Sequence, residues 1–462
     1  MNYDFAIIGG GSAGYAAART ATALGLKTVI VEGGREVGGL CILRGCMPSK
    51  TLIESANRML TLRRAEEFGL RAGGLEAHAD EIVARKRKLI GGFADYRREE
   101  LESGKFDFIR GRARFTDPHT IEIEWPDTQP RTLRAKSFLI ATGSVVNQPE
   151  IPGLPECGAI TSDEALELQV LPKSLVVLGA GPVALELAHY FSALGTEVTV
   201  LQRGSQILTG SDPDLAEALE KALRERMAIF TKTKVTAIEC DARGKRVTFE
   251  HGGKSLTVEC AQILNALGRH PDLDGLGLDA AKVEQTHGNV GTNARQQTSQ
   301  PHIFAAGDCC GPYQIVHIAV QQGEIAARNA ARILKNDVAL ESSDYRLKLY
   351  VVFTEPQLAM VGLSEAEARE RGIAYRTAKY PFDDHGKSLV MGETHGFVKL
   401  IADAKTREIL GGSVVGPHAS DLIHEIVVAM NFRTTAAQLA AIPHYHPTLS
   451  EIWTYPAEEL AS

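Results

Sequence analysis

Phe5-Ala6-Ile7-Ile8-Gly9-Gly10-Gly11-Ser12-Ala13-Gly14 is the stretch of the chain that decides its fold. Its apolar half predicts a buried strand. Its second half has the pattern G-x-G-x-x-G, in which Gly9, Gly11 and Gly14 are the three glycines and Ser12 lies between the last two. The first glycine permits a tight turn, the second lets the backbone approach a pyrophosphate, and the third lets a helix pack closely on the strand. We therefore expect phosphates to lie on amides at the N-terminus of the next helix.

The residues after this turn complete a strand–helix–strand unit. An alanine-rich helix is expected over 15–24, and a second strand over 28–32 ends at Glu32. A carboxylate at that position can bind both hydroxyls of a ribose. Because the glycine pattern occurs together with its strand, its helix and its acid, the unit predicts a dinucleotide site.

The same pattern occurs a second time further along the chain. Strands are expected over 174–178 and 197–201, with a glycine turn at Gly179 and Gly181 and with Ala184 in the place of the third glycine. The repeat predicts two separate dinucleotide sites in one chain. The alternative is a duplicated unit in which one site has lost its function.

The two units differ at the end of their second strands. Counted from the first glycine of each turn, the position that corresponds to Glu32 is Gln202, and Arg203 follows it. The second site thus lacks the carboxylate that would repel a 2′-phosphate and has a cation beside that position, which favours NADPH over NADH. The alternative is that Arg203 is a solvated surface charge.

Two cysteines, Cys41 and Cys46, follow the first unit with four residues between them. No further Cys or His at zinc-ligand spacing lies nearby, so we expect no metal site. Nothing else in the sequence suggests a secreted protein built on disulfides. We interpret the pair as a redox-active disulfide; the alternative is two buried thiols.

The bulk properties set wider bounds. A chain of 462 residues predicts two or three domains rather than one core. The net charge of −7 argues against general binding of nucleic acid, and no apolar run approaches a membrane span. The first strand begins almost at Met1, which leaves no room for a signal peptide. Seven cysteines are compatible with a reducing cytosol, so we expect a cytoplasmic protein with no nucleic-acid or membrane partner.

Six motifs in order resemble those of the class I pyridine nucleotide-disulfide oxidoreductases, which are flavoprotein disulfide reductases. The motifs are the redox segment Cys41–Lys50, the crossing segment Ala141-Thr142-Gly143-Ser144, the return segment 267–271 with Gly268, the segment Ala306-Gly307-Asp308, residues 352–356, and His446–Glu451. The resemblance places Ala141, Thr142, Gly143, Asp308 and His317 at an FAD site, and Gly268 at an NAD(P) site.

The resemblance implies an α/β fold with two Rossmann-like dinucleotide-binding domains and a C-terminal α+β dimerisation domain, assembled as a homodimer. The FAD domain would be split over 1–147 and 271–340, the NAD(P) domain would span 148–270, and the interface domain would span 341–462.

Local alternation of apolar and polar residues predicts two pairs of strands outside the glycine-rich units. One pair is expected at 106–110 and 120–124, and a second hairpin pair at 396–401 and 408–414.

The resemblance also implies a route for electrons from NAD(P)H through FAD to a substrate disulfide. Cys46 would lie beside the flavin, and Cys41 would attack the substrate. Only a thiolate is nucleophilic, so the site needs a base or a lowered thiol pKa. His446, oriented by Glu451, fits the base, whereas the competing His444 lacks that partner spacing.

The resemblance also implies that Lys50 and Glu186 form a second pair, near the reactive part of the flavin. A buried ion pair there would hold a positive charge where reduced flavin develops a negative one. The alternative is two solvated helix charges, but Glu186 lies among apolar residues.

The substrate is less closely defined by the motifs. Pro48-Ser49-Lys50 and the C-terminal signature are most like dihydrolipoamide dehydrogenase, which predicts a lipoyl-carrier disulfide. Arg19 and Tyr96, together with the expected NADPH preference, instead agree with glutathione reductase and a small-molecule disulfide, although Glu324 stands where that enzyme has an arginine. Mercuric reductase carries a C-terminal cysteine pair that this chain lacks. A flavin-binding electron carrier without disulfide turnover is the third hypothesis.

Cys309 and Cys310 follow Asp308 directly and are expected to be structural thiols. Adjacent cysteines are poor disulfide partners because their Cα atoms are only about 3.8 Å apart. Free cysteine is also commonly buried as a small apolar residue. The alternative is a thiol relay or a soft-metal site near the flavin.

Overall fold

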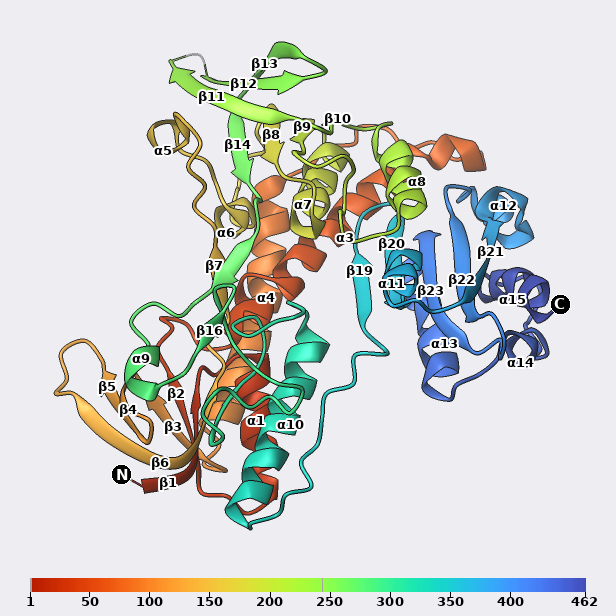
Figure 1. Ribbon diagram of the computed structural model, residues 1–462. Helices are drawn as coiled ribbons and strands as arrows, with labels where there is room; N and C mark the ends of the chain where they lie inside the picture. Colours follow the sequence, from red (N-terminus) through yellow and green to blue (C-terminus); the bar gives the residue numbers. More distant parts are fainter. Residues whose placement is uncertain (1, 243) are drawn as a thin grey trace. The chain divides into compact units, whose positions relative to one another are not determined.

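The computed structural model describes residues 2–242 and 244–462, which form two compact units (Figure 1). Unit 1 comprises Met1–Pro48, Ala84–Asn147 and Gly268–Asp344. Unit 2 comprises Ser49–Val83, Gln148–Leu267 and Tyr345–Ser462. Among the residues described, none of the helices combines the length and the apolar character that a membrane crossing requires.

Unit 1 is built on a seven-stranded sheet with the order β3-β2-β1-β6-β5-β4, to which β18 adds beside β6. Strands β3, β2, β1, β6 and β18 are parallel, and β5 and β4 run antiparallel. The strands are β1 Asn2–Ile8, β2 Thr28–Glu32, β3 Asp107–Arg110, β4 Arg112–Asp117, β5 Thr120–Glu124, β6 Arg131–Ile140 and β18 Ile303–Ala305.

Helices α1 (Ser12–Ala23) and α10 (Val316–Leu334) pack against each other in unit 1. Their contact is made by small residues: Ala17, Ala18 and Ala21 of α1 are fully buried. The alanine-rich sequence therefore lets two helices approach closely beside the first strand. The other elements of this unit are α2 Gly39–Leu43, α9 Leu278–Ala281, and the strand pairs β7 Ser144–Val146 with β15 Arg269–Pro271 and β16 Gln285–Thr286 with β17 Asn289–Val290.

Unit 2 repeats the strand–helix–strand pattern on a four-stranded parallel sheet with the order β10-β9-β8-β14. A three-stranded antiparallel sheet, β11-β12-β13, is inserted in the chain between β10 and β14. The strands are β8 Ser174–Leu178, β9 Glu197–Leu201, β10 Ala228–Phe230, β11 Lys234–Asp241, β12 Gly244–His251, β13 Lys254–Cys260 and β14 Gln262–Asn265, and the helices are α5 Leu154–Cys157, α6 Ser162–Ala165, α7 Pro182–Ala193 and α8 Pro213–Leu223.

The C-terminal part of unit 2 is a five-stranded antiparallel sheet with the order β19-β20-β23-β22-β21. Its core includes the fully buried Trp453. The strands are β19 Leu349–Val352, β20 Gln357–Gly362, β21 Tyr375–Pro381, β22 Phe397–Asp403 and β23 Ile409–Gly416, and the helices are α11 Glu365–Glu370, α12 Gly386–Met391, α13 Ala419–Asn431, α14 Ala436–Ala440 and α15 Thr454–Ala461.

Two of the points where the chain passes between the units lie inside long helices. Helix α3 spans Cys46–Arg63, and α4 spans Ala79–Leu101. Short 3₁₀ turns complete the described secondary structure at Ala65–Phe68, Phe382–Asp384 and Ser450–Trp453.

The predicted α/β class and both strand–helix–strand units are confirmed. The hairpin predicted at 396–401 and 408–414 is also confirmed, as β22 and β23. The strands predicted at 106–110 and 120–124 are confirmed as β3 and β5, but they do not pair with each other: β3 pairs in parallel with β2, and β5 pairs with β4 and β6. The alternation located the strands, but it carries no information about partners that are distant in sequence.

His189 on α7 is a fully buried titratable group inside unit 2. Its Nε2 lies 2.8 Å from Asn57 Oδ1, and its Nδ1 lies 3.4 Å from a guanidinium nitrogen of Arg226. Burial, reinforced by the Arg226 charge, lowers the pKa of His189 from 6.5 to about 3. The imidazole is therefore neutral in the folded protein at neutral pH.

This histidine predicts a loss of stability in acid. His189 binds a proton near pH 6.5 in the unfolded chain and only near pH 3 in the folded chain. The stability that depends on a neutral His189 is therefore fully present above pH 6.5 and is lost as the pH falls towards 3. The contribution of this group to the free energy of unfolding should fall by at most about 1.4 kcal/mol per pH unit. Urea unfolding at a series of pH values should show a shallower acid slope for His189→Gln than for wild type. The exposed His395→Gln is the control; equal slopes in all three proteins would contradict the assignment.

Candidate active site

The first glycine turn of unit 1 forms a backbone cradle between β1 and α1. Gly9 has φ +105°, and a Cβ there would lie 2.3 Å from Ala141 O. A Cβ on Gly14 would lie 1.9 Å from Gly9 O, so only glycine lets the helix pack so close to the turn. Gly11 is the N-cap of α1, where no side chain bonds the first amides, and Ser12 begins the helix. These amides fit a pyrophosphate group.

Glu32 ends β2 and is held against the same turn. Its Oε2 accepts a hydrogen bond from Gly10 N at 2.7 Å, and its Oε1 accepts one from Gly34 N at 2.6 Å. The carboxylate is only partly buried. It therefore lies at the carboxyl end of the parallel strands, where a ribose is bound in dinucleotide folds.

The crossing segment and the Asp308 motif meet in unit 1. Ser144 Oγ donates to Asp308 Oδ2 at 2.7 Å and accepts from Arg269 Nε at 2.9 Å. Thr142 Oγ1, between Ala141 and Gly143, is buried and has no hydrogen-bond partner among the described residues. Together with the glycine cradle, these polar groups fit an FAD site. His317 lies exposed in the first turn of α10.

The two cysteines of the redox motif lie on consecutive helices. Cys41 is in α2, and Cys46 is the first residue of α3. Both are half-buried and are recorded as thiols. A Cβ on Gly39 would lie 2.6 Å from Gly11 Cα, so α2 begins directly against the first glycine turn. Helix N-terminal amides favour a negative charge, which suits a thiolate at Cys46.

Lys50 and Glu186 form an ion pair in unit 2, as the sequence predicted for them. Lys50 Nζ lies 2.7 Å from Glu186 Oε2, and Glu186 Oε1 accepts from Phe353 N at 3.1 Å. The Lys50 ammonium also lies 4.6 Å from the centre of the Phe353 ring. The Glu186 side chain is only 7% exposed, so the alternative of two solvated helix charges is wrong for it.

The second glycine turn lies in unit 2 between β8 and α7. Gly179 has φ +100°, and Gly181 is the N-cap of α7 without a capping side chain. Gln202 directly follows β9, and its Nε2 donates to Gln206 O at 3.1 Å. Arg203 is exposed beside it. Gly268, which the resemblance placed at the NAD(P) site, lies in unit 1, where its carbonyl accepts from Asn147 N.

His446 and Glu451 are brought together near the C-terminus. His446 Nδ1 lies 3.0 Å from Glu451 Oε2, and the His446 side chain is 79% exposed while Glu451 is only 10% exposed. His444 lacks that spacing in the sequence, but the fold gives it a carboxylate partner. Its Nε2 lies 2.6 Å from Glu425 Oε1 on α13, but its side chain is only 9% exposed. Of these two histidines, His446 is the one that presents its imidazole to the surroundings of unit 2.

His385 is a further residue at this site that the sequence did not indicate. It is fully buried, with Nε2 3.4 Å from Glu451 Oε1 and Nδ1 2.8 Å from Ser388 Oγ. Burial lowers the pKa of His385, which favours a neutral ring beside the Glu451 carboxylate. Glu451 thus lies between two histidines. No motif spacing links residues 385 and 451, so only the fold reveals the contact.

Cys309 and Cys310 are also recorded as thiols. Cys309 is fully buried in the core of unit 1, and its Sγ contacts the carbonyl oxygens of Ala306 and Ile140 at 3.3 and 3.4 Å. The position in the core agrees with the structural hypothesis for these cysteines.

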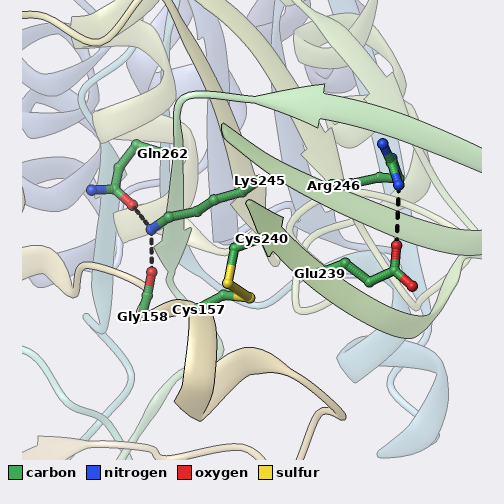
Figure 2. The surroundings of a disulfide bond; sticks show 7 residues. All are labelled: Cys157, Gly158, Glu239, Cys240, Lys245, Arg246 and Gln262. Carbon is green, nitrogen blue, oxygen red and sulfur yellow. Dashed lines mark hydrogen bonds and ion pairs between the residues drawn. A yellow bond between two sulfur atoms is a disulfide. The ribbon is translucent and has the colours of Figure 1, made fainter. Parts of the chain in front are cut away.

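A disulfide that the sequence did not predict joins Cys157 and Cys240 in unit 2 (Figure 2). The two cysteines lie 83 positions apart. At that separation no local pattern distinguishes a bonded pair from two unrelated thiols.

Three acidic side chains of unit 2, Asp212, Asp214 and Glu365, converge within metal-ligand distance of one another. The buried Lys399 ammonium lies among them, 2.9 to 3.1 Å from one oxygen of each. The Lys399 ammonium therefore occupies the position among the three carboxylates that a metal ion would need.

Comparison with known proteins agrees with this arrangement. Residues 3–323 match the pyridine nucleotide-disulphide oxidoreductase family, and residues 349–457 match its dimerisation domain. Dihydrolipoyl dehydrogenase of Thermus scotoductus is 38% identical over 99% of this chain and 97% of its own, and mercuric reductase of Bacillus cereus is 35% identical over 97% of this chain and 70% of its own.

Two solved structures cover 99% of this chain and 99% of their own. They are the HOCl-induced flavoprotein disulfide reductase RclA from Escherichia coli, with TM-score 0.86 and 26% identity, and LpdA from Mycobacterium tuberculosis, with TM-score 0.86 and 29% identity. The matches support an FAD-dependent NAD(P)H:disulfide oxidoreductase most similar to dihydrolipoyl dehydrogenases. The chain belongs to the pyridine nucleotide-disulphide oxidoreductase family.

Proposed function

We propose that the protein transfers electrons between NAD(P)H and a lipoyl-type dithiol/disulfide. The observation that carries this proposal is the exposed His446 paired with the buried Glu451, in a chain that retains both Cys41 and Cys46. An exposed imidazole with a fixed carboxylate partner is suited to exchanging protons with thiols. The full-length similarity to dihydrolipoyl dehydrogenases supports the choice of substrate.

The two cysteines have different tasks in the proposed reaction. The first glycine turn, Glu32 and Asp308 would hold FAD, which when bound would supply two-electron transfer between NAD(P)H and the Cys41–Cys46 disulfide. In the reduced pair, Cys41 attacks the substrate disulfide as a thiolate and forms a mixed disulfide. Cys46 then attacks the Cys41 sulfur, which re-forms the Cys41–Cys46 disulfide and releases the substrate as a dithiol. His446 holds and returns the proton that these thiols exchange, and Glu451 fixes its tautomer.

The ion pair of Lys50 and Glu186 supplies a fixed charge. The carboxylate is held by Lys50 and by the Phe353 amide, so the lysine is held in one position. A preoriented ammonium stabilises negative charge without reorganising when that charge develops. We propose that this charge serves the reduced cofactor.

We also propose a domain division, an oligomeric state, a location and a nucleotide preference for the protein. The dimerisation domain over 349–457 supports a homodimer. The three-domain division, with FAD residues 1–147 and 271–340, NAD(P) residues 148–270 and interface residues 341–462, accounts for the order of the motifs. We place the protein in the cytoplasm and favour NADPH, because Gln202 replaces an acid and Arg203 is exposed beside it.

A small-molecule disulfide is the second candidate substrate. The Arg19 guanidinium lies 5.8 Å from the centre of the Tyr15 ring, and Tyr96 is exposed. Glu324 counted against an anionic substrate on sequence grounds, but it lies 3.6 Å from Arg328. That cation offsets the like-charge repulsion, although only weakly at an exposed site.

A panel of disulfides separates the candidates. Enzyme with bound FAD is reduced anaerobically with one equivalent of NADPH and mixed with a lipoyl domain, lipoamide or glutathione disulfide at equal concentration. Lipoyl compounds should reoxidise it at least about tenfold faster than glutathione disulfide, and Cys41→Ser should react with none. Faster reaction with glutathione disulfide would overturn the lipoyl proposal. Reoxidation by ferricyanide alone would favour the electron carrier.

The nucleotide preference predicts the effect of one substitution. Gln202→Glu should shift preference from NADPH to NADH, because a carboxylate gains the ribose hydroxyls and repels a 2′-phosphate. The ratio of kcat/KM for the two nucleotides measures the shift, and Gln206→Glu on the same loop is the control. A wild-type enzyme that already favours NADH by about tenfold, or roughly 1.4 kcal/mol, would contradict the NADPH assignment.

The two histidine–glutamate pairs provide a matched test of the base. His446→Gln should lower disulfide turnover by about 10²- to 10⁴-fold, because it removes the exposed proton-exchanging group. His444→Gln removes a buried imidazole whose contact with its carboxylate partner is shorter than that of His446, and it should change turnover little. NADPH oxidation with ferricyanide should persist in both variants. Equal losses for the two variants would reject the assignment of His446.

A further inference from the structure

A second pair of cysteines in unit 2 lies outside the reaction proposed above. The Cys157–Cys240 disulfide joins the last residue of α5 to β11, with Cα atoms 5.5 Å apart (Figure 2). Cys240 is exposed and Cys157 is half-buried. A dissolved thiol or disulfide can therefore reach this pair.

The backbone holds the two cysteines opposite each other independently of the S–S bond. Ile238 N, on β11, donates to Pro152 O at 2.9 Å. A Cβ on Gly153 would lie 1.8 Å from Ile238 O, so the chain before α5 lies directly against the strand. These contacts would keep the thiols close after reduction, which favours closure of the same pair again.

A lysine lies beside the pair. Lys245 on β12 is directly opposite Cys240 on β11 and directly opposite Cys260 on β13. Residues opposite one another in antiparallel strands share a face of the sheet, and in Figure 2 the Lys245 side chain extends to Gly158, the residue that follows Cys157. Its Nζ donates to Gly158 O and, at 2.6 Å, to Gln262 Oε1. Both acceptors are neutral oxygens, so they do not cancel the charge of the ammonium.

An ammonium beside a thiol favours its thiolate, which is the form that attacks disulfides. In the cytoplasm, where we place the protein, a disulfide is typically transient, catalytic or redox-sensing. The geometry points to a second thiol–disulfide exchange site at Cys157 and Cys240, oxidised by low-molecular-weight disulfides, reduced by thiols, and promoted by Lys245.

The exchange is balanced in atoms and electrons. One cysteine thiolate attacks a disulfide RSSR, forms a mixed disulfide and releases RS⁻; the second thiolate then attacks the mixed disulfide and releases another RS⁻. Two electrons pass from the cysteine pair to RSSR. The two protons lost by the cysteine thiols are taken up by the released thiolates or the medium. An excess of RSH reverses both steps.

Closure has a defined consequence for unit 2. The covalent loop from Cys157 to Cys240 contains β8, α7, β9, α8 and β10, and with them Gly179 and Gln202 of the second glycine-rich unit. A cross-link of this span restricts the unfolded chain. The oxidised protein should therefore have the higher unfolding temperature, by about 5 °C or more.

The experiment uses the FAD-bound enzyme equilibrated with graded ratios of glutathione to glutathione disulfide. Differential alkylation and peptide mass spectrometry then report Cys157 and Cys240 separately from Cys41 and Cys46. The pair should open and close reversibly across the series, and the unfolding temperature should follow its oxidation state. A pair that stays oxidised or stays reduced throughout would overturn the proposal. The Cys157→Ser, Cys240→Ser double variant should show no such dependence on the ratio.

The role of Lys245 has its own comparison. Lys245→Met should slow closure by glutathione disulfide at pH 7 about three- to tenfold, because a change of one pKa unit alters the thiolate fraction tenfold. Lys245→Arg keeps the cation and should close at a rate near wild type. Lys254→Met, on the same sheet, is the control. The closure rates of the variants and wild type should converge above pH 9, where the thiols ionise without help.

Equal closure rates at pH 7 for Lys245→Met and wild type would show that the lysine does not promote closure. If Lys245→Met fails to fold, the pH dependence of wild-type closure is the test. A closure rate that rises in proportion to the hydroxide concentration from pH 6 to 9 would also show that Lys245 does not promote closure.

Discussion

The close packing of backbone around the first glycine turn is the constraint on which unit 1 depends. A side chain at Gly14 would meet Gly9 O at 1.9 Å, and one at Gly39 would meet Gly11 Cα at 2.6 Å. The same turn therefore fixes α1 against β1 and α2 against the turn. Because Cys41 lies in α2, the redox motif is positioned by the same turn whose amides fit a pyrophosphate. In the proposed reaction, cofactor binding and thiol chemistry would therefore share one rigid support.

Unit 2 supplies charges that are held rather than mobile. Glu186 is fixed by Lys50 and the Phe353 amide, and Glu451 contacts both His446 and the buried His385. In each case a buried carboxylate is paired, which offsets the cost of removing its charge from water. Preoriented partners of this kind suit proton and electron transfer, because little reorganisation is needed when charge changes.

Much of this could be predicted from the sequence, because the decisive features are local. Gly9, Gly11 and Gly14 predict strand, turn and helix together, and the spacing of His446 and Glu451 predicts their contact. The features that sequence reasoning missed depend on long-range packing. His385 reaches Glu451, His444 reaches Glu425, and Cys157 reaches Cys240 only through the folded chain. The pairing of β3 with β2 was missed for the same reason.

The central claim is that Cys41 and Cys46 carry two electrons between the nicotinamide nucleotide and the substrate. Differential alkylation of the FAD-bound enzyme, before and after one equivalent of NADPH without oxygen, tests it most directly. The account predicts that Cys41 and Cys46 are protected from alkylation before NADPH and that NADPH makes Cys41 reactive, with Cys309 and Cys310 unchanged. Labelling of Cys41 that NADPH does not alter, or a change at Cys309 and Cys310 instead, would contradict it.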